Sequence, residues 1–264
     1  MAAEQIDPSA AANSSQAVEE YVMHHVLDSH EWSLPFLHVH LPPFLSLHGL
    51  MLVIGATILV LLFSVLYRKR DPVPHGLTNC LEVLILFIRD QIAIPNLGDH
   101  HGRKLTPLFC TFFFFILCLN LMGLVPIFAT ATSTVSVTGP LALITLAFMI
   151  GGTIYLNGVG GFIKTFVPHG VPWPVLILLV PVEFLGMFIK AFALMIRLFA
   201  NMIAGHLVIL LLLGMVMTFG AWAAPAVGLA VGIYLLEIMV AFLQAYIFTL
   251  LSAMFMGQMY HPQH

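Results

Sequence analysis

Charged side chains are scarce in this sequence. Asp, Glu, Lys and Arg make up only 8% of its 264 residues, against about 25% in an average soluble domain. Hydrophobic residues make up 60%, and the mean hydropathy is +1.02. So few charges could not cover so large an apolar core in water. The deficit therefore excludes a soluble globular domain and predicts an integral membrane protein.

Several further absences narrow the class. The apolar runs lack strand-like alternation, which argues against a β-barrel. The net charge is −3 and no basic cluster suits nucleic acid. Cys110 and Cys118 lie about 12 Å apart along one predicted helix, which is too far for a disulfide. The three cysteines include no Cys-x-x-Cys pair, so no metal site is expected. A phosphate-binding Gly-x-x-x-x-Gly-Lys-Ser/Thr loop is also missing, so we expect no bound nucleotide and no cofactor.

Residues 1–48 contain no Lys or Arg. They therefore match neither a secretory signal nor an Arg-rich transit peptide. Five histidines lie here without a helical i, i+4 pair and a carboxylate partner: His24, His25, His30, His38 and His40. We interpret 1–48 as a non-cytoplasmic N-terminal segment on the membrane face, in preference to a metal site.

Residues 49–264 are predicted to form an all-α membrane domain with five to six helices, because several uncharged runs reach the roughly 20 residues needed to span a bilayer. The spans are expected at about 49–66, 105–128, 140–156, 175–219 and 226–259, with an interfacial helix or short hairpin at about 76–95. A polar loop is expected at 99–104 and a Gly-rich loop at 158–164.

The distribution of basic residues predicts the topology, since cytoplasmic loops carry an excess of Lys and Arg. Six basic residues would share the cytoplasmic side: Arg68, Lys69, Arg70, Arg103, Lys104 and Lys164. The N-terminus would then lie outside and the C-terminus in the cytoplasm.

The last two helices are expected to be long, steeply tilted and antiparallel. From 182 to 219 no turn signal interrupts the apolar run, and Pro181 can occupy the first helical turn. A helix of that length measures about 57 Å, nearly twice the roughly 30 Å of hydrocarbon. Two ordinary spans with long ends are the alternative, but they would leave apolar residues such as Leu250–Met256 in water.

Two basic residues, Lys190 and Arg197, lie inside the predicted long helix. An arginine at the bilayer centre costs at least about 2.5–3.5 kcal/mol, and no Asp or Glu lies within four residues of Arg197. At 100° per residue, four polar residues share a stripe about 40° wide: Glu183, Lys190, Arg197 and Asn201. His206 falls on the opposite face. On the last helix Glu237, Gln244 and Gln258 form a second polar line.

Two polar lines through apolar surroundings indicate a proton path. Buried Glu and His can exchange protons near neutral pH, whereas Arg stays charged and blocks the passage of cations. A line of titratable groups interrupted by one permanent charge suits two half-channels separated by a barrier. The alternative is a polar stripe that only holds helices together.

Four segments carry a family resemblance. Residues 197–206 read RLFANMIAGH, 243–248 read LQAYIF, 120–126 read NLMGLVP and 158–164 read GVGGFIK. Together, and in this order, they resemble subunit a of F-type ATP synthases. The resemblance implies a non-catalytic, proton-translocating stator. Its partners would be the c-ring, the peripheral stalk (subunit b), the rest of the synthase and the lipid bilayer.

The resemblance also implies roles for individual residues. Arg197 matches the arginine that faces the ring carboxylates, and four residues match polar positions of the half-channels: Glu183, Lys190, Asn201 and Gln244. His206 and Glu237 match a pair that occurs in the reverse order in some bacterial members. A bacterial inner membrane is favoured over the mitochondrial one, because a transit peptide is absent.

A stand-alone secondary proton or ion transporter is the competing class. Such folds commonly contain two repeats with broken helices in matching positions. The sequence shows no internal repeat, and its intramembrane charges are concentrated in the last third of the chain.

Overall fold

The computed structural model describes residues 31–34, 37–40, 47–66, 76–125, 128, 130–167, 172–219 and 224–260. The helices are α2 (Leu47–Leu66), α3 (Leu77–Phe87), α4 (Ile94–Leu124), α5 (Val135–Thr165), α6 (Trp173–Phe219) and α7 (Ala224–Tyr260). A π-helix, η1 (Ile88–Ala93), joins α3 to α4, and a 3-10 turn, η2 (Ala131–Ser133), precedes α5. Within the described residues, five helical stretches are long and apolar enough to cross a membrane. The predicted all-α membrane fold is confirmed.

A small β-hairpin adds to this helical domain. Strands β1 (Glu31–Leu34) and β2 (Leu37–His40) pair antiparallel, with Trp32 opposite Val39. The sequence predicted only a polar segment here, because four-residue strands are too short to show a clear alternation of polar and apolar residues. Residues 1–30, with three of the five N-terminal histidines, lie outside the described residues.

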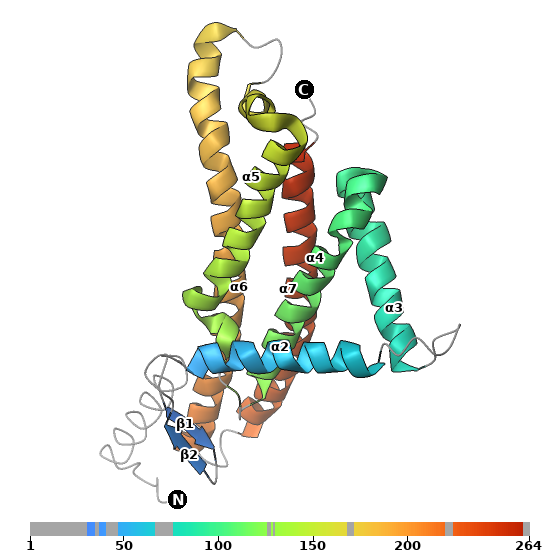
Figure 1. Ribbon diagram of the computed structural model, residues 1–264. Helices are drawn as coiled ribbons and strands as arrows, with labels where there is room; N and C mark the ends of the chain where they lie inside the picture. The colour runs from blue at the N-terminus through green and yellow to red at the C-terminus, as the bar shows by residue number, and fades with distance from the viewer. Residues whose placement is uncertain are drawn as a thin grey trace, which may run out of the picture.

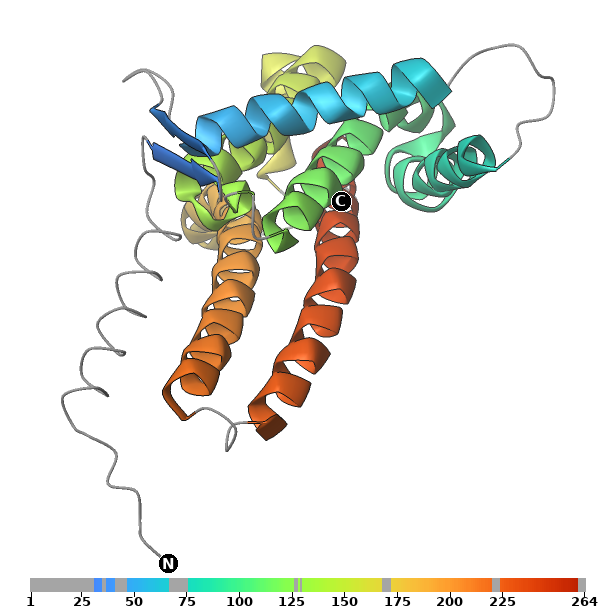
Figure 2. The same ribbon diagram turned by 90° about the horizontal axis from the view of Figure 1, so that it is seen from below.

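Helices α6 and α7 are the longest elements, and they run antiparallel beside each other (Figure 1 and Figure 2). At 1.5 Å per residue, their 47 and 37 residues measure about 70 Å and about 55 Å. Neither fits upright into roughly 30 Å of hydrocarbon. Helix α6 also begins earlier than predicted, so Pro181 lies inside it and not in its first turn. The apolar residues on both sides keep the helix continuous, since a break in lipid would leave more backbone groups unpaired.

Helix α2 runs crosswise to α6 and α7 in both views (Figure 1 and Figure 2). Its 20 residues measure about 30 Å, which matches the hydrocarbon thickness of a bilayer. If α2 stands upright in the membrane, the two long helices lie far from the membrane normal. This arrangement explains how about 70 Å of apolar helix avoids water.

The prediction of a polar loop at 99–104 is wrong, because these residues form the first turns of the main part of α4. The chain reverses at Gly98 alone, whose φ of 77° lies in the left-handed region that favours glycine. Asp99 and Arg103 pair one turn apart at 3.4 Å. The stretch predicted as an interfacial helix at 76–95 becomes the first arm of a helical hairpin, and Gly102 allows the two arms to approach closely.

The Gly-rich loop predicted at 158–164 is also mostly helical. Gly158, with φ 70° and ψ 172°, interrupts α5, and the chain is helical again up to Thr165. A single glycine makes the bend, so the neighbouring glycines do not need a loop. In both this case and that of Gly98, one residue with positive φ replaces several residues of irregular chain.

The core lies where α4 crosses α7 and the other helices gather around them (Figure 1). Phe112 of α4 and Phe248 of α7 are almost fully buried, and their rings meet edge to face with centroids 5.6 Å apart. Helix α6 packs against α7 and α5, and its buried residues include Ala191, Leu194 and Leu198. This packing holds the polar side chains of α6 and α7 close to each other.

Candidate functional site

The polar stripe of α6 meets polar residues of α7 at two levels. Near the end of α7, the Lys190 ammonium donates a hydrogen bond to Gln258 Oε1 at 2.9 Å and lies 5.5 Å from the centre of the Phe255 ring. About 11 residues along α6, the Asn201 amide donates to Gln244 Oε1 at 2.7 Å. Because the helices are antiparallel, residues further along α6 meet residues earlier in α7. The two polar lines predicted from the sequence therefore do face each other at these points.

Arg197 lies between these two contacts. Its Nη1 atom is buried and has no hydrogen-bond partner among the described residues. Among the described residues, ion pairs form between Arg89 and Asp90 and between Arg103 and Asp99. No described carboxylate lies within 4.0 Å of Arg197. A buried guanidinium nitrogen without a partner costs free energy. Among the described residues, the site around Arg197 therefore lacks a counter-charge.

Glu237 of α7 is buried, with 4% of its surface exposed, and its carboxyl group lies directly against Gly205 of α6. A Cβ atom at position 205 would lie 2.5 Å from Glu237 Oε1 and 2.9 Å from its Cδ. Those distances are below an ordinary van der Waals contact. Glycine is therefore required at position 205 for the carboxyl group to approach the helix backbone this closely.

A small cavity joins these groups to a third helix. It is lined by polar residues of α4, α6 and α7 and by the apolar side chains among them: Asn120, Asn201, Glu237, Gln244, Leu198, Met202, Val240 and Ala241. Its volume of about 10 Å³ is near the lower limit for one water molecule. Asn120 Oδ1 and Gln244 Nε2 are buried, with no hydrogen-bond partner among the described residues. Both could bond to a water placed here.

The structure does not bring all seven predicted site residues together. Asn201, Glu237 and Gln244 share the cavity, while Arg197 and Lys190 follow along the same stripe. Glu183 is exposed and lies about 21 Å along the helix from Arg197. His206 belongs to α6, but its side chain lies outside the described residues, so its predicted pairing with Glu237 stays a prediction.

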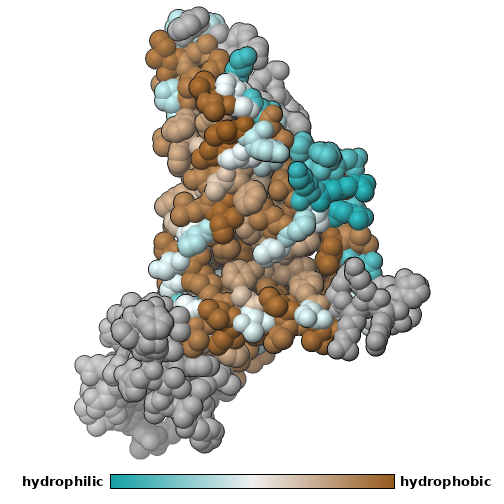
Figure 3. Space-filling view, in the orientation of Figure 1, coloured by the Kyte–Doolittle hydropathy of each residue, from teal (hydrophilic) through white to brown (hydrophobic). Residues whose placement is uncertain are grey.

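An exposed apolar surface borders Arg197. On α6, Ile189, Phe192 and Ile196 are 56%, 59% and 37% exposed, and on α7 Met239 is 61% exposed. The space-filling view shows how much of the molecule is apolar on the face that it presents (Figure 3). Lipid or a partner protein must cover such a surface. Arg197, a cation without a hydrogen-bond or ion-pair partner among the described residues, lies on the same helix as three of these exposed residues.

Sequence reasoning missed two residues of this site. Asn120 was noted as part of a motif but not as a neighbour of Glu237, because it lies on α4, more than 100 residues away in the chain. Gly205 appeared in the sequence only as part of the segment RLFANMIAGH, and its contact with Glu237 depends on how α6 and α7 pack. A polar amide inside an apolar span was the available signal for Asn120, since such residues usually face the protein interior.

Known proteins match the part of the chain that contains this site. The family model described as ATP synthase A chain matches residues 49–257. The chain is 46% identical over 261 residues to ATP synthase subunit a of Chloroherpeton thalassium, covering 92% of this chain and 77% of that protein. It is 51% identical over 195 residues to ATP synthase subunit a of Anaeromyxobacter dehalogenans strain 2CP-1, covering 72% of this chain and 50% of the relative.

A third relative, ATP synthase subunit a of Myxococcus xanthus, is 44% identical over 218 residues, with 80% of this chain and 71% of that protein covered. The chain thus spans between half and about three quarters of the length of these relatives. The matched residues contain α6, most of α7, Arg197 and the cavity between α4, α6 and α7. The chain belongs to the ATP synthase A chain family.

Proposed function

We propose that this chain is the proton-translocating stator subunit of an F-type ATP synthase. Arg197 carries the proposal, because it is a permanent cation with a buried Nη1 that has no partner among the described residues. Its missing partner would be the proton-carrying carboxylate of a c-ring subunit that passes along the exposed face of α6. The chain itself would be non-catalytic and would bind no nucleotide.

The proposed path has two halves that Arg197 separates. A proton enters past Glu237 and His206 and neutralises a ring carboxylate, which can then turn into lipid. On the other side of Arg197, along Lys190 and Glu183, the carboxylate has released its proton before it meets the guanidinium. Each proton that crosses 100 mV supplies about 2.3 kcal/mol.

The small cavity supports the first half of this path. Glu237 is buried and lines this cavity together with the amides of Asn120, Asn201 and Gln244, which form a polar route beside it among the described residues. Amides can donate and accept hydrogen bonds but do not titrate, which suits a lining that orients water. Glu237 and His206 would then be the pair past which the proton enters.

The wider assembly and its orientation belong to the same proposal. The c-ring would cover the exposed face of α6 and α7, and the peripheral stalk (subunit b) and lipid would cover other parts of the surface. The membrane would be a bacterial inner membrane rather than the mitochondrial one. The N-terminus would lie outside and the C-terminus in the cytoplasm, with Arg103, Lys104 and Lys164 on the cytoplasmic side, as expected for basic residues.

The test is Arg197→Ala in the complete ATP synthase, with Arg89→Ala as the matched control, since Arg89 is already paired with Asp90 at 2.7 Å. We expect the Arg197 variant to assemble with its ring but to lose ATP-driven proton pumping. Arg197→Lys should fail as well, because an ammonium lacks the planar fork of guanidinium. Normal pumping by an assembled Arg197→Ala enzyme would refute the proposal, as would purification of the chain without a ring.

A further inference from the structure

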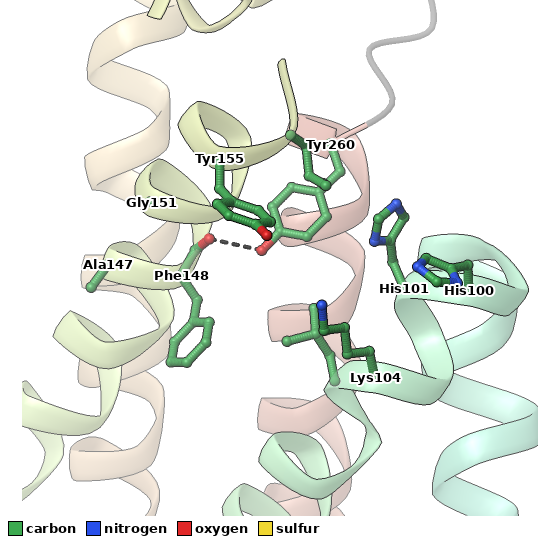
Figure 4. Close-up of a pocket in the computed structure, with 11 residues that line it drawn as sticks. His100, His101, Lys104, Ala147, Phe148, Gly151, Tyr155 and Tyr260 are labelled. Atoms are coloured by element: carbon green, nitrogen blue, oxygen red, sulfur yellow. Dashed lines mark hydrogen bonds between the residues drawn. The ribbon is translucent and has the colours of Figure 1, made fainter. Parts of the chain in front are cut away.

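A second, much larger cavity lies between α4, α5 and α7, and the path above does not use it. Its volume is about 690 Å³, within the roughly 300–1,000 Å³ typical of pockets for small ligands. Figure 4 shows His101 and Lys104 of α4 on one side, and Phe148, Gly151 and Tyr155 of α5 on the other. The cavity is therefore open between two helices and could admit a ligand from the side.

Gly151, Gly152 and Tyr260 shape this cavity. A Cβ atom at Gly151 would meet nothing within 4 Å, so the space in front of this residue is open. Tyr260 packs against Gly152, and its hydroxyl donates a hydrogen bond to the Phe148 carbonyl at 2.9 Å (Figure 4). The Asn157 amide donates to the Tyr260 carbonyl at 3.2 Å. These bonds tie the end of α7 to α5 and fix the wall of the cavity.

The lining has a polar end and an apolar end. Lys104, His100 and His101 come from the start of α4, and no Asp or Glu occurs among the described residues that line the cavity. The nearby carboxylate of Asp99 pairs with Arg103, not with Lys104. The rest of the lining is mostly apolar, with Leu105, Ala147, Phe148 and Leu156. This combination suits a ligand with an anionic head and a hydrocarbon tail.

The position of the cavity favours a lipid over a free anion. Its lining residues belong to three of the membrane-spanning stretches, and they lie next to the hydrophilic surface over the turn into α4 (Figure 3). The exposed pairs Arg89–Asp90 and Arg103–Asp99 lie on either side of this turn. The cavity therefore lies where the hydrocarbon meets the headgroup region. Basic pockets between spanning helices on the cytoplasmic side bind anionic lipid headgroups.

We propose that this cavity is a binding site for one anionic phospholipid. Its phosphate would be held by Lys104 and the adjacent histidines, with Tyr155 as a further hydroxyl donor. One acyl chain would lie along Phe148, Ala147 and Gly151 of α5.

The experiment uses the purified ATP synthase complex and a phosphatidylglycerol that carries a photoreactive group in its acyl chain. After illumination, the labelled peptides are mapped by mass spectrometry. Gly151→Leu fills the open space, and its control is Gly160→Leu, where a Cβ also meets nothing within 4 Å but which does not line the cavity. Lys104→Gln removes the charge, and Lys164→Gln is its control.

We expect labelling within 147–156 of the wild-type chain. Gly151→Leu should abolish it and Lys104→Gln should reduce it about fivefold, the loss expected for one lysine near an anionic lipid. The two controls should label like the wild type. Three results would overturn the proposal. A phosphatidylcholine probe could label the chain equally, neither cavity variant could change the labelling, or excess inorganic phosphate could abolish it. The last result would make the cavity a phosphate site.

Discussion

Replacing Gly205 by alanine tests the contact between α6 and Glu237. In an exposed helix, glycine to alanine stabilises by about 1 kcal/mol, so helix propensity alone predicts a more stable protein. The added Cβ would however lie 2.5 Å from Glu237 Oε1, whereas ordinary contacts begin near 3.4 Å. The carboxyl group must therefore move by about 1 Å. Such a displacement of a reacting group can cost about 100-fold in rate.

We therefore expect Gly205→Ala to assemble normally but to pump protons about 10- to 100-fold more slowly. The assay is ATP-driven quenching of a pH-sensitive dye in inverted membrane vesicles, with the amount of assembled complex measured in parallel. Gly160→Ala is the control, because a Cβ there meets nothing within 4 Å. Adding Glu237→Asp shortens the acid by one methylene, so the double variant should recover part of the activity of Gly205→Ala.

Wild-type pumping by Gly205→Ala would refute this reasoning, since the close approach of Glu237 to α6 would then not matter for proton transfer. A loss of assembled complex would show instead that the two helices cannot separate enough to admit the methyl group. The recovery with Glu237→Asp distinguishes these cases, because it depends on the length of the acid. No recovery would indicate that the carboxyl group acts elsewhere.

Further predictions concern the neighbouring polar groups. Exchanging His206 and Glu237 should restore more pumping than either single change, and a double variant as poor as the worse single one would show that the two are not coupled. Asn120→Leu should leave stability nearly unchanged, because Oδ1 has no described partner, but it should slow pumping several-fold. In Gln258→Glu the new carboxylate should pair with Lys190 and slow pumping, whereas Gln258→Leu should have little effect on pumping. Equal effects of the two variants would contradict a role for the Lys190 charge.

Much of the fold could be predicted from the sequence, because length and apolar composition act directly on a chain in lipid. The apolar run around Arg197 was too long for an upright span, and the structure has one continuous helix there. The turns were harder to predict. Gly98 and Gly158 each replace an expected loop, since one residue with positive φ is enough to interrupt a helix.

The candidate site could be predicted along each helix but not across helices. The spacing of Lys190, Arg197 and Asn201 follows from helical geometry and needs no tertiary information. The pairing of Asn201 with Gln244 depends on the register of α6 against α7, and the presence of Asn120 depends on where α4 crosses them. Neither register nor crossing point has a signature in one sequence.

The crosswise placement of α2 and α6 has a consequence for the direction of transport. When α2 stands along the membrane normal, a step along α6 is mainly a sideways step (Figure 1). Glu183 and Asn201 lie about 27 Å apart along that helix. The two ends of the polar stripe then differ more in lateral position than in depth. A carrier confined to the membrane plane could visit both ends, and its sense of travel would be set by the side on which protons are more abundant.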